Sequence, residues 1–176
     1  DPIRPEASAV INSLKRAGIS KVVMMTGDSE RTAKAVAAQI GVDEYYSEVL
    51  PEDKAGFVER EKAAGRKVIM IGDGINDSPA LSAADVGIAI SDGAEIAREI
   101  ADVTIGADNL YEIVTLKAIS NGLMKRIHKN YRSIILVNAG LIALGVTGMI
   151  QPTTSALLHN TSTLVIGLKS MQNLID

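Results

Sequence analysis

Two stretches without a charged residue lie near the C-terminal end of the chain, and they constrain its fold more than any other feature. The first runs from Ser133 to Ile150 and the second from Ser155 to Leu168, with only Gln151–Thr154 between them. As a helix, the first stretch would be about 27 Å long, close to the roughly 30 Å hydrocarbon core of a bilayer. The short link predicts an antiparallel hairpin, with transmembrane helices at 132–150 and 155–174.

A basic cluster directly precedes the first stretch. Residues 125–132 read Lys-Arg-Ile-His-Lys-Asn-Tyr-Arg, and Lys169 follows the second stretch. Positive residues mark the cytoplasmic flank of a spanning helix. The cluster therefore favours an integral membrane protein with residues 1–131 cytoplasmic, and we expect the membrane to be a bacterial plasma membrane. A pair of buried helices in a large soluble protein is the alternative.

Up to about residue 130, charged and apolar residues alternate as in a soluble domain, and the absence of cysteine fits a reducing cytosol. Apolar periodicity and glycine stops predict helices at 5–17, 29–40, 52–64, 77–84 and 94–100. Short apolar runs predict strands at 21–25, 44–49, 67–71, 86–90 and 103–105. Alternating strands and helices indicate an α/β fold, a Rossmann-like parallel sheet flanked by helices, over residues 1–108. An amphipathic helix at 109–131 would connect it to the hairpin.

Oxygen-bearing side chains gather where the predicted strand at 67–71 ends. The sequence there reads Gly72-Asp-Gly-Ile-Asn-Asp77, which places Asp73, Asn76 and Asp77 on one tight turn. Ligands of open parallel sheets bind at the carboxyl ends of the strands. Mg²⁺ prefers oxygen ligands and commonly bridges one or two carboxylates to a phosphate. The turn therefore predicts a site for Mg²⁺ and a phosphate.

Two more turns carry candidate phosphate ligands. Thr26-Gly27-Asp28 follows the strand at 21–25, where a hydroxyl could donate to a phosphate oxygen; a helix cap at Asp28 or Ser29 is the alternative. Lys54 lies in Leu50-Pro-Glu-Asp-Lys54 and could offer an ammonium, although Pro51 also fits a plain helix start. Hydroxyl, lysine and paired acids together predict a Mg²⁺-dependent phosphoryl-transfer site.

These motifs, with Asp1-Pro-Ile-Arg4 and the Ser-Pro-Ala-Leu81 that follows Asp77, resemble the second half of the phosphorylation domain of P-type ATPases. The Ser-Pro-Ala-Leu continuation is typical of the heavy-metal-transporting branch, and the fold is that of the haloacid dehalogenase superfamily. The hairpin resembles the last two membrane helices of that branch. The resemblance implies that Thr26, Gly27, Asp28 and Lys54 surround an aspartyl phosphate. It also implies that Asp73 coordinates Mg²⁺, supported by Asn76 and Asp77.

The chain departs from that pattern in what it lacks. It has neither the Asp-Lys-Thr-Gly motif whose aspartate accepts the phosphoryl group of ATP nor a nucleotide-binding insertion. We therefore expect a C-terminal piece of a longer polypeptide, inactive alone and dependent on upstream domains. Two alternatives remain: a soluble phosphatase of the same superfamily, and a membrane-anchored module without catalysis.

Polar residues within the hairpin are candidates for binding a transported metal, because such residues are costly in a membrane and often functional. The candidates are His159, Asn160, Asn138 and Thr163. Imidazole with oxygen donors favours Zn²⁺, Cd²⁺, Mn²⁺ or Co²⁺ over Cu⁺, and the family implies efflux. The alternative is that these groups link the helices or, for the hydroxyls, bond back to their own helix. No nucleic-acid partner is expected.

Overall fold

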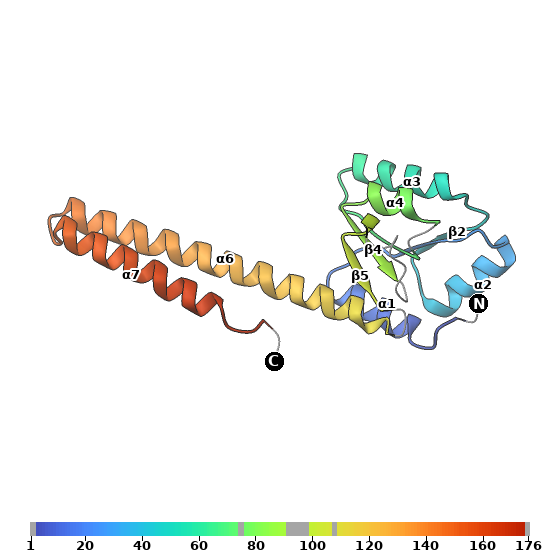
Figure 1. The fold of residues 1–176 in the computed structure, drawn as a ribbon, viewed down its shortest axis with the longest axis horizontal. Helices are drawn as coiled ribbons and strands as arrows, with labels where there is room; N and C mark the ends of the chain where they lie inside the picture. The colour runs from blue at the N-terminus through green and yellow to red at the C-terminus, as the bar shows by residue number, and fades with distance from the viewer. Residues whose placement is uncertain (1–2, 74–75, 91–98, 107–108, 175–176) are drawn as a thin grey trace. The chain divides into compact units, whose positions relative to one another are not determined.

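Parallel strands form the framework of the first of two units of the chain, residues 1–116. The structure is a computed structural model that describes residues 3–73, 76–90, 99–106 and 109–174. One sheet contains β3 (Ile69–Gly72), β4 (Val86–Ile90) and β5 (Val103–Ile105) in that order (Figure 1). A second contains β1 (Val23–Met25) and β2 (Glu44–Tyr46). All of these pairs run parallel, which confirms the predicted α/β class, with the described strands paired in two groups.

The helices of this unit also follow the predicted order. They are α1 (Ala7–Arg16), α2 (Glu30–Ile40), α3 (Pro51–Ala63) and α4 (Ser78–Ala83). Pro51 is the first residue of α3, where its missing N–H costs nothing. Most of the helix predicted at 94–100 lies outside the described residues.

Helices cover both faces of the three-stranded sheet, as its strand pattern requires. On one face, Val10 and Leu14 of α1 pack with Ile88, Ile105 and the buried Ile113. On the other, Val58 of α3 packs with Met70 of β3 and with Ala80 and Leu81 of α4. Successive strand residues point to opposite faces, so Met70 and its neighbour Ile71 join different clusters. α4 also lies so close to β4 that a Cβ on Gly87 would stand 2.7 Å from the Leu81 carbonyl oxygen.

An aspartate precedes three of the strands and accepts an N–H group at or just before the start of the neighbouring strand. Asp43, before β2, accepts the Val22 N–H at 2.7 Å. Asp85, before β4, accepts the Val68 N–H at 2.9 Å, and Asp102, before β5, accepts the Gly87 N–H at 2.8 Å. Each aspartate thus satisfies a backbone donor at the edge opposite the predicted site and fixes where its strand begins.

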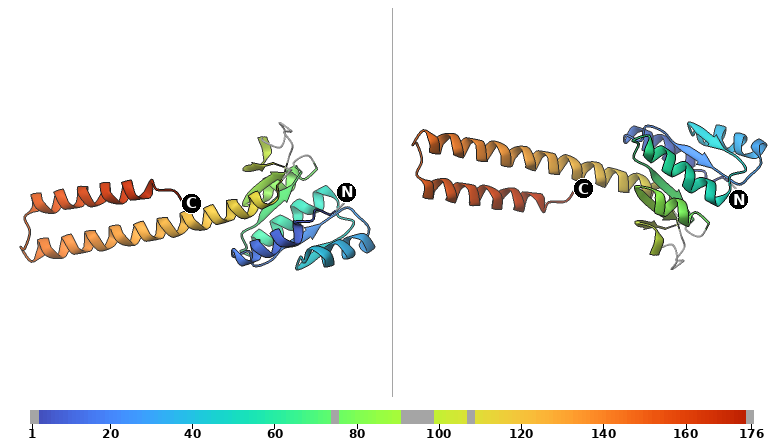
Figure 2. Two further views of the ribbon diagram at one scale, coloured as in Figure 1. Left: turned by 90° about the horizontal axis from the view of Figure 1, so that it is seen from below. Right: turned by 90° about the horizontal axis from the view of Figure 1, so that it is seen from above.

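Two antiparallel helices form the second unit, residues 117–176. They belong to α6 (Tyr111–Val146) and α7 (Pro152–Ser170), which lie side by side in the views of Figures 1 and 2. Asn130 Nδ2 donates to Ser170 Oγ at 2.6 Å. Arg126 donates to the carbonyl oxygens of Ser170 (2.9 Å), Gln172 and Asn173 (2.7 Å), which places a cation at the negative end of the α7 dipole. The predicted hairpin is present.

The transmembrane assignment at 132–150 and 155–174 is not confirmed. None of the helices in the described ranges has both the length and the apolarity that a bilayer crossing requires. α6 is 36 residues long, but its uncharged part after Arg132 ends at Val146 and would measure only about 21 Å. α7 carries polar side chains from His159 to Thr163 in its middle turns, which lowers its hydropathy.

Candidate functional site

Lys54 and Asp77 form the central contact among the predicted site residues. Lys54 Nζ lies 2.7 Å from Asp77 Oδ1, and the two side chains are only 16% and 12% exposed. Lys54 is on the first turn of α3, and Asp77 directly precedes α4. α3 and α4 pack side by side against β3 (Figure 1), which brings the two residues together although 23 positions separate them. If either partner of such a buried pair is removed, the other is left as an uncompensated buried charge, which destabilises the fold.

Gly72, the last residue of β3, makes room for this pair. A Cβ on Gly72 would overlap the Asp77 carboxylate and would stand 2.7 Å from the Asp77 Cβ. Any other residue at position 72 would therefore push Asp77 out of place. The sequence predicted a turn at Gly72. The structure shows that this glycine also leaves the space that the Asp77 carboxylate occupies.

Asp73 and Asn76 occupy the exposed side of the same turn. The Asn76 N–H points to Asp73 Oδ1 at a distance of 3.4 Å. Both residues are exposed, whereas Asp77 is buried. Gly74 and Ile75, between them, are outside the described residues. Of the three side chains with oxygen atoms on this turn, Asp77 therefore contacts Lys54, whereas Asp73 and Asn76 are exposed to solvent.

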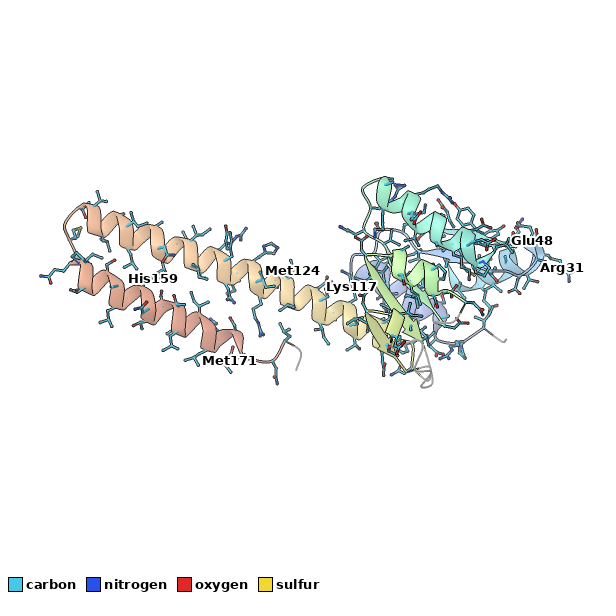
Figure 3. All side chains as sticks on the ribbon, turned by 45° about the horizontal axis from the view of Figure 1, so that its top comes forward. Arg31, Glu48, Lys117, Met124, His159 and Met171 are labelled. Carbon is cyan, nitrogen blue, oxygen red and sulfur yellow. The ribbon has the colours of Figure 1, made fainter. Side chains whose placement is uncertain are left out.

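The Thr26–Asp28 turn is held by its own hydrogen bonds. The Thr26 hydroxyl donates to Asp28 Oδ2 at 3.0 Å and accepts the Asp28 N–H at 3.1 Å. The loop after β2 fixes its backbone, because Val49 donates to the Thr26 carbonyl at 3.0 Å and Glu48 (Figure 3) donates to the Asp28 carbonyl at 2.9 Å. Glu48 has a positive φ of 53°. Ser29 occupies the N-cap position of α2, one of the two positions that the helix-cap alternative named, but makes no side-chain capping bond.

One apolar cluster supports all three loops. Met25, the residue before Thr26, packs against the cluster of Val58, Met70, Ala80 and Leu81. Val58 is one turn after Lys54, and Met70 is two residues before Gly72. The structure therefore brings Lys54 and Asp77 into direct contact and anchors the Thr26 and Asp73 turns on the same core. The convergence of all of them on one phosphoryl group stays a prediction.

The donor set of this region suits a hard cation held jointly with a phosphate. Across the described residues, no three His, Cys, Asp or Glu side chains gather closely enough to hold a metal ion by themselves. Mg²⁺ commonly uses one or two carboxylates and completes its shell with waters and phosphate oxygens. Asp73 offers such an exposed carboxylate, whereas Asp77 is engaged by Lys54.

In the second unit, two of the candidate metal ligands meet across the hairpin. His159 Nδ1 of α7 (Figure 3) and Asn138 Oδ1 of α6 lie 2.9 Å apart. The Thr163 hydroxyl donates to the His159 carbonyl at 3.0 Å, the back-bonding that the sequence left as the alternative. Asn160 is exposed on α7. The contacts of Arg126 and Asn130 with the end of α7 were not predicted, although their spacing before the apolar stretch placed them on its flank.

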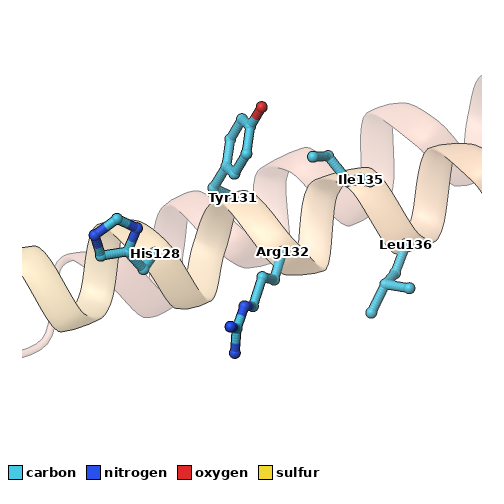
Figure 4. A pocket seen from close by; sticks show the side chains of 5 residues that line it. All are labelled: His128, Tyr131, Arg132, Ile135 and Leu136. Atoms are coloured by element: carbon cyan, nitrogen blue, oxygen red, sulfur yellow. The ribbon is translucent and has the colours of Figure 1, made fainter.

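Open grooves of this unit lie elsewhere, along α6 alone. Figure 4 shows one of them, lined by His128, Tyr131, Arg132, Ile135 and Leu136. A second shares three of these residues and adds Lys125, Lys129 and Ser133. Both are basic at one end and apolar at the other.

Known proteins similar to this chain include hydrolases and metal-transporting ATPases. Residues 1–85 match the haloacid dehalogenase-like hydrolase family. The chain is 41% identical over 167 residues to a manganese-exporting P-type ATPase of Mycobacterium leprae and, over the same length, to a zinc-exporting P-type ATPase of Mycobacterium marinum. Each match covers 94% of this chain and 23% of the relative, so the chain spans about a quarter of the length of these relatives.

A solved structure matches the whole chain. The crystal structure of a zinc-transporting PIB-type ATPase in its E2.Pi state superposes with a TM-score of 0.86 at 30% sequence identity. The match covers 100% of this chain and 28% of that protein.

Proposed function

This chain is homologous to the haloacid dehalogenase-like hydrolases and to the metal-transporting P-type ATPases, and on that premise we propose that it is the Mg²⁺-dependent phosphoryl-transfer part of an ATP-driven metal transporter. The buried pair of Lys54 and Asp77, 2.7 Å apart at the carboxyl end of β3, is the observation that carries this proposal. A lysine held there by a carboxylate is a fixed cation at the sheet edge where α/β proteins bind ligands.

Lys54 would bind the phosphoryl group directly. Its ammonium has three N–H donors, and Asp77 accepts one of them. The remaining donors can reach phosphoryl oxygens while Asp77 holds the ammonium in place. Asp77 is thus a positioning residue for Lys54 in this proposal, in addition to its expected support of the metal site.

Thr26 would add a hydroxyl donor to the same group. At present that hydroxyl donates to Asp28 Oδ2, while the Asp28 N–H holds its oxygen. A phosphoryl oxygen could replace the Asp28 carboxylate as acceptor without moving the Thr26 side chain. Gly27, which carries no Cβ, leaves the approach to this turn open.

Asp73 would hold Mg²⁺ with phosphoryl oxygens and waters, and Asn76 would keep the turn in shape through its N–H bond to Asp73. When bound, Mg²⁺ neutralises charge on the phosphoryl group. The exposure of Asp73 supports this role, because a ligand can reach its carboxylate from solvent.

The transported ion would bind at His159. In this proposal the His159 Nδ1 carries the proton and donates it to Asn138 Oδ1 in their hydrogen bond. Nε2 would then be the ring nitrogen that binds the metal, and Asn138 would be the partner that fixes the tautomer. Asn160 and Thr163 would lie at the edge of this site. Zn²⁺, Cd²⁺, Mn²⁺ and Co²⁺ suit an imidazole with oxygen donors better than Cu⁺ does.

We further propose that the hairpin is the membrane-associated part of a longer polypeptide, with the first unit on the cytoplasmic side. Many large apolar residues of the hairpin are exposed, among them Leu136 (72%), Ile142 (67%), Leu157 (66%) and Leu164 (63%). Such a surface needs lipid or neighbouring helices to cover it. The whole-length superposition on a zinc-transporting ATPase supports this placement.

The test is ATP hydrolysis by the longer polypeptide that carries this sequence. We expect hydrolysis that requires Mg²⁺ and is stimulated by Zn²⁺ or Mn²⁺, and we expect Asp73→Asn to abolish it. Asp53→Asn, an exposed carboxylate on α3, is the matched control and should leave the rate unchanged. Hydrolysis of small phosphate esters by the 176-residue chain alone would instead favour the phosphatase alternative.

A further inference from the structure

The second unit has six basic residues but only one acidic residue, Asp176 at its end. No Asp or Glu lies between Glu112 and Asp176, whereas this interval contains Lys117, Lys125, Arg126, Lys129, Arg132 and Lys169. Among the described residues, no salt bridge involves Lys125, Lys129 or Arg132, and all three are exposed. An uncompensated cluster of this kind attracts an anionic partner.

These cations occupy one face of α6 because their spacing is helical. Lys125, Lys129 and Arg132 recur at intervals of four and three residues, and with His128 they line one open groove. Arg126 is directed elsewhere, to the last carbonyls of α7. The bond between Asn130 and Ser170 brings Lys169 of α7 to the same end of the hairpin. The cations that line the groove therefore all come from α6, and Lys169 adds a positive charge at the same end of the hairpin.

The face changes from basic to apolar within two turns. Arg132 and Leu136 line both grooves and point the same way from α6 in Figure 4, while Tyr131 and Ile135, which line the first groove with them, point the other way in that view. Leu136 is 72% exposed and Tyr131 is 64% exposed. An amphipathic tyrosine at such a boundary is typical of a membrane interface.

We propose that this surface, formed by Lys125, His128, Lys129, Arg132 and Leu136, binds the headgroup of an anionic phospholipid. The cations would contact the phosphate, and Leu136 would contact the first part of the acyl chain. A soluble anion such as free phosphate would match the charge but leave the apolar end uncovered. Nucleic acid would do the same. The proposal rests on the charge and the apolar end of this surface, and on no residue of the phosphoryl-transfer or metal site. It can therefore fail while those sites hold, and those sites can fail while it holds.

The test compares binding of the full chain to vesicles of phosphatidylcholine and to vesicles that also contain phosphatidylglycerol. We expect tighter binding to the anionic vesicles, and a loss of that preference by roughly a hundredfold in Lys125→Gln/Lys129→Gln/Arg132→Gln, since each cation near such a surface contributes about fivefold. Lys125→Arg/Lys129→Arg should keep the preference. The preference should also fall as salt is raised, because exposed charges are screened.

The matched control is Arg16→Gln/Arg31→Gln/Lys34→Gln, which removes the same three charges from exposed positions of the first unit. It should keep the preference for anionic vesicles. Three results would each overturn the proposal: equal binding to both kinds of vesicle, an equal loss in the control variant, or tighter binding to a single-stranded oligonucleotide than to anionic vesicles. Circular dichroism of every variant would verify that its helices are retained.

Discussion

Asp77 fills the space that the missing side chain of Gly72 leaves at the end of β3. From there Asp77 Oδ1 accepts a hydrogen bond from Lys54 Nζ at 2.7 Å. The strand end, the start of α3 and the start of α4 are therefore joined through one carboxylate. Stability and site geometry depend on the same three residues, which makes both testable by substitution.

Removal of one partner of the buried pair should be strongly destabilising. We expect Asp77→Ala to lower the free energy of unfolding by about 3–5 kcal/mol, because it leaves the Lys54 ammonium buried without a counter-ion. Glu59→Ala, an exposed position of α3, should change it by less than about 0.5 kcal/mol. Urea denaturation followed by circular dichroism measures both. If Lys54→Met and Asp77→Ala simply added in the double variant, the two residues would not interact and the assignment of the pair would be wrong.

Alanine should have opposite effects at two glycines. Gly72→Ala places a methyl group against the Asp77 carboxylate and should cost about 1–3 kcal/mol of unfolding free energy. Gly56 lies inside α3, where a Cβ would meet only the end of the Arg60 side chain at 3.5 Å. Gly56→Ala should therefore stabilise by about 0.5–1 kcal/mol, the gain in helix propensity. Equal melting temperatures for Gly72→Ala and the unaltered chain would contradict the close approach.

Stability should fall in acid partly through Asp85. The Lys67 ammonium and the Val68 N–H both hold the pKa of the Asp85 carboxyl below its ordinary value of 3.8. The folded state therefore binds this proton less readily than the unfolded state, so the contribution is complete above the ordinary pKa and is lost as pH falls through the lowered pKa. Unfolding free energies between pH 5 and pH 2 should decline less steeply in Asp85→Asn. An unchanged slope would remove Asp85 from this role, and Asp53→Asn serves as the control.

The two histidines of the chain should differ in metal binding. We expect His159→Ala to abolish binding of Zn²⁺ or Mn²⁺ to the hairpin, whereas His128→Ala should leave it intact, because His128 lies in the groove on α6 away from Asn138. Titration of the metals into the detergent-solubilised chain tests this. ¹⁵N chemical shifts would report the tautomer of His159. The proton should be on Nδ1, and Asn138→Ala should remove the preference for this tautomer. Equal loss in the two histidine variants would contradict a site at His159.

Local patterns in the sequence were enough to predict most of the elements. The short apolar run Val86–Ile90 is a strand over its full predicted range, and α2 begins one residue inside its prediction. The site residues Lys54 and Asp77 were both singled out, but their pairing depends on how α3 and α4 pack, which spacing along the chain does not specify. The same holds for Asn138 and His159 on opposite helices.

The hairpin shows where pattern alone was insufficient. Continuity of uncharged residues to Ile150 predicted a helix that ends there, yet α6 ends at Val146, just before Gly148 with its φ of 73°. Hydropathy summed along the chain ignores where a helix ends. The separation of the strands into two hydrogen-bonded groups likewise depends on pairing between segments distant in sequence.

Labelling with [γ-³²P]ATP tests the central claim most directly, because a phosphoryl-transfer domain of a metal-transporting ATPase must support a phosphorylated intermediate. The longer polypeptide that carries this sequence should incorporate ³²P in an acid-stable, hydroxylamine-sensitive form, dependent on Mg²⁺ and lost in Asp73→Asn but kept in Asp53→Asn. Label that persists at full level in Asp73→Asn, or that never forms in the unaltered protein, would contradict the account.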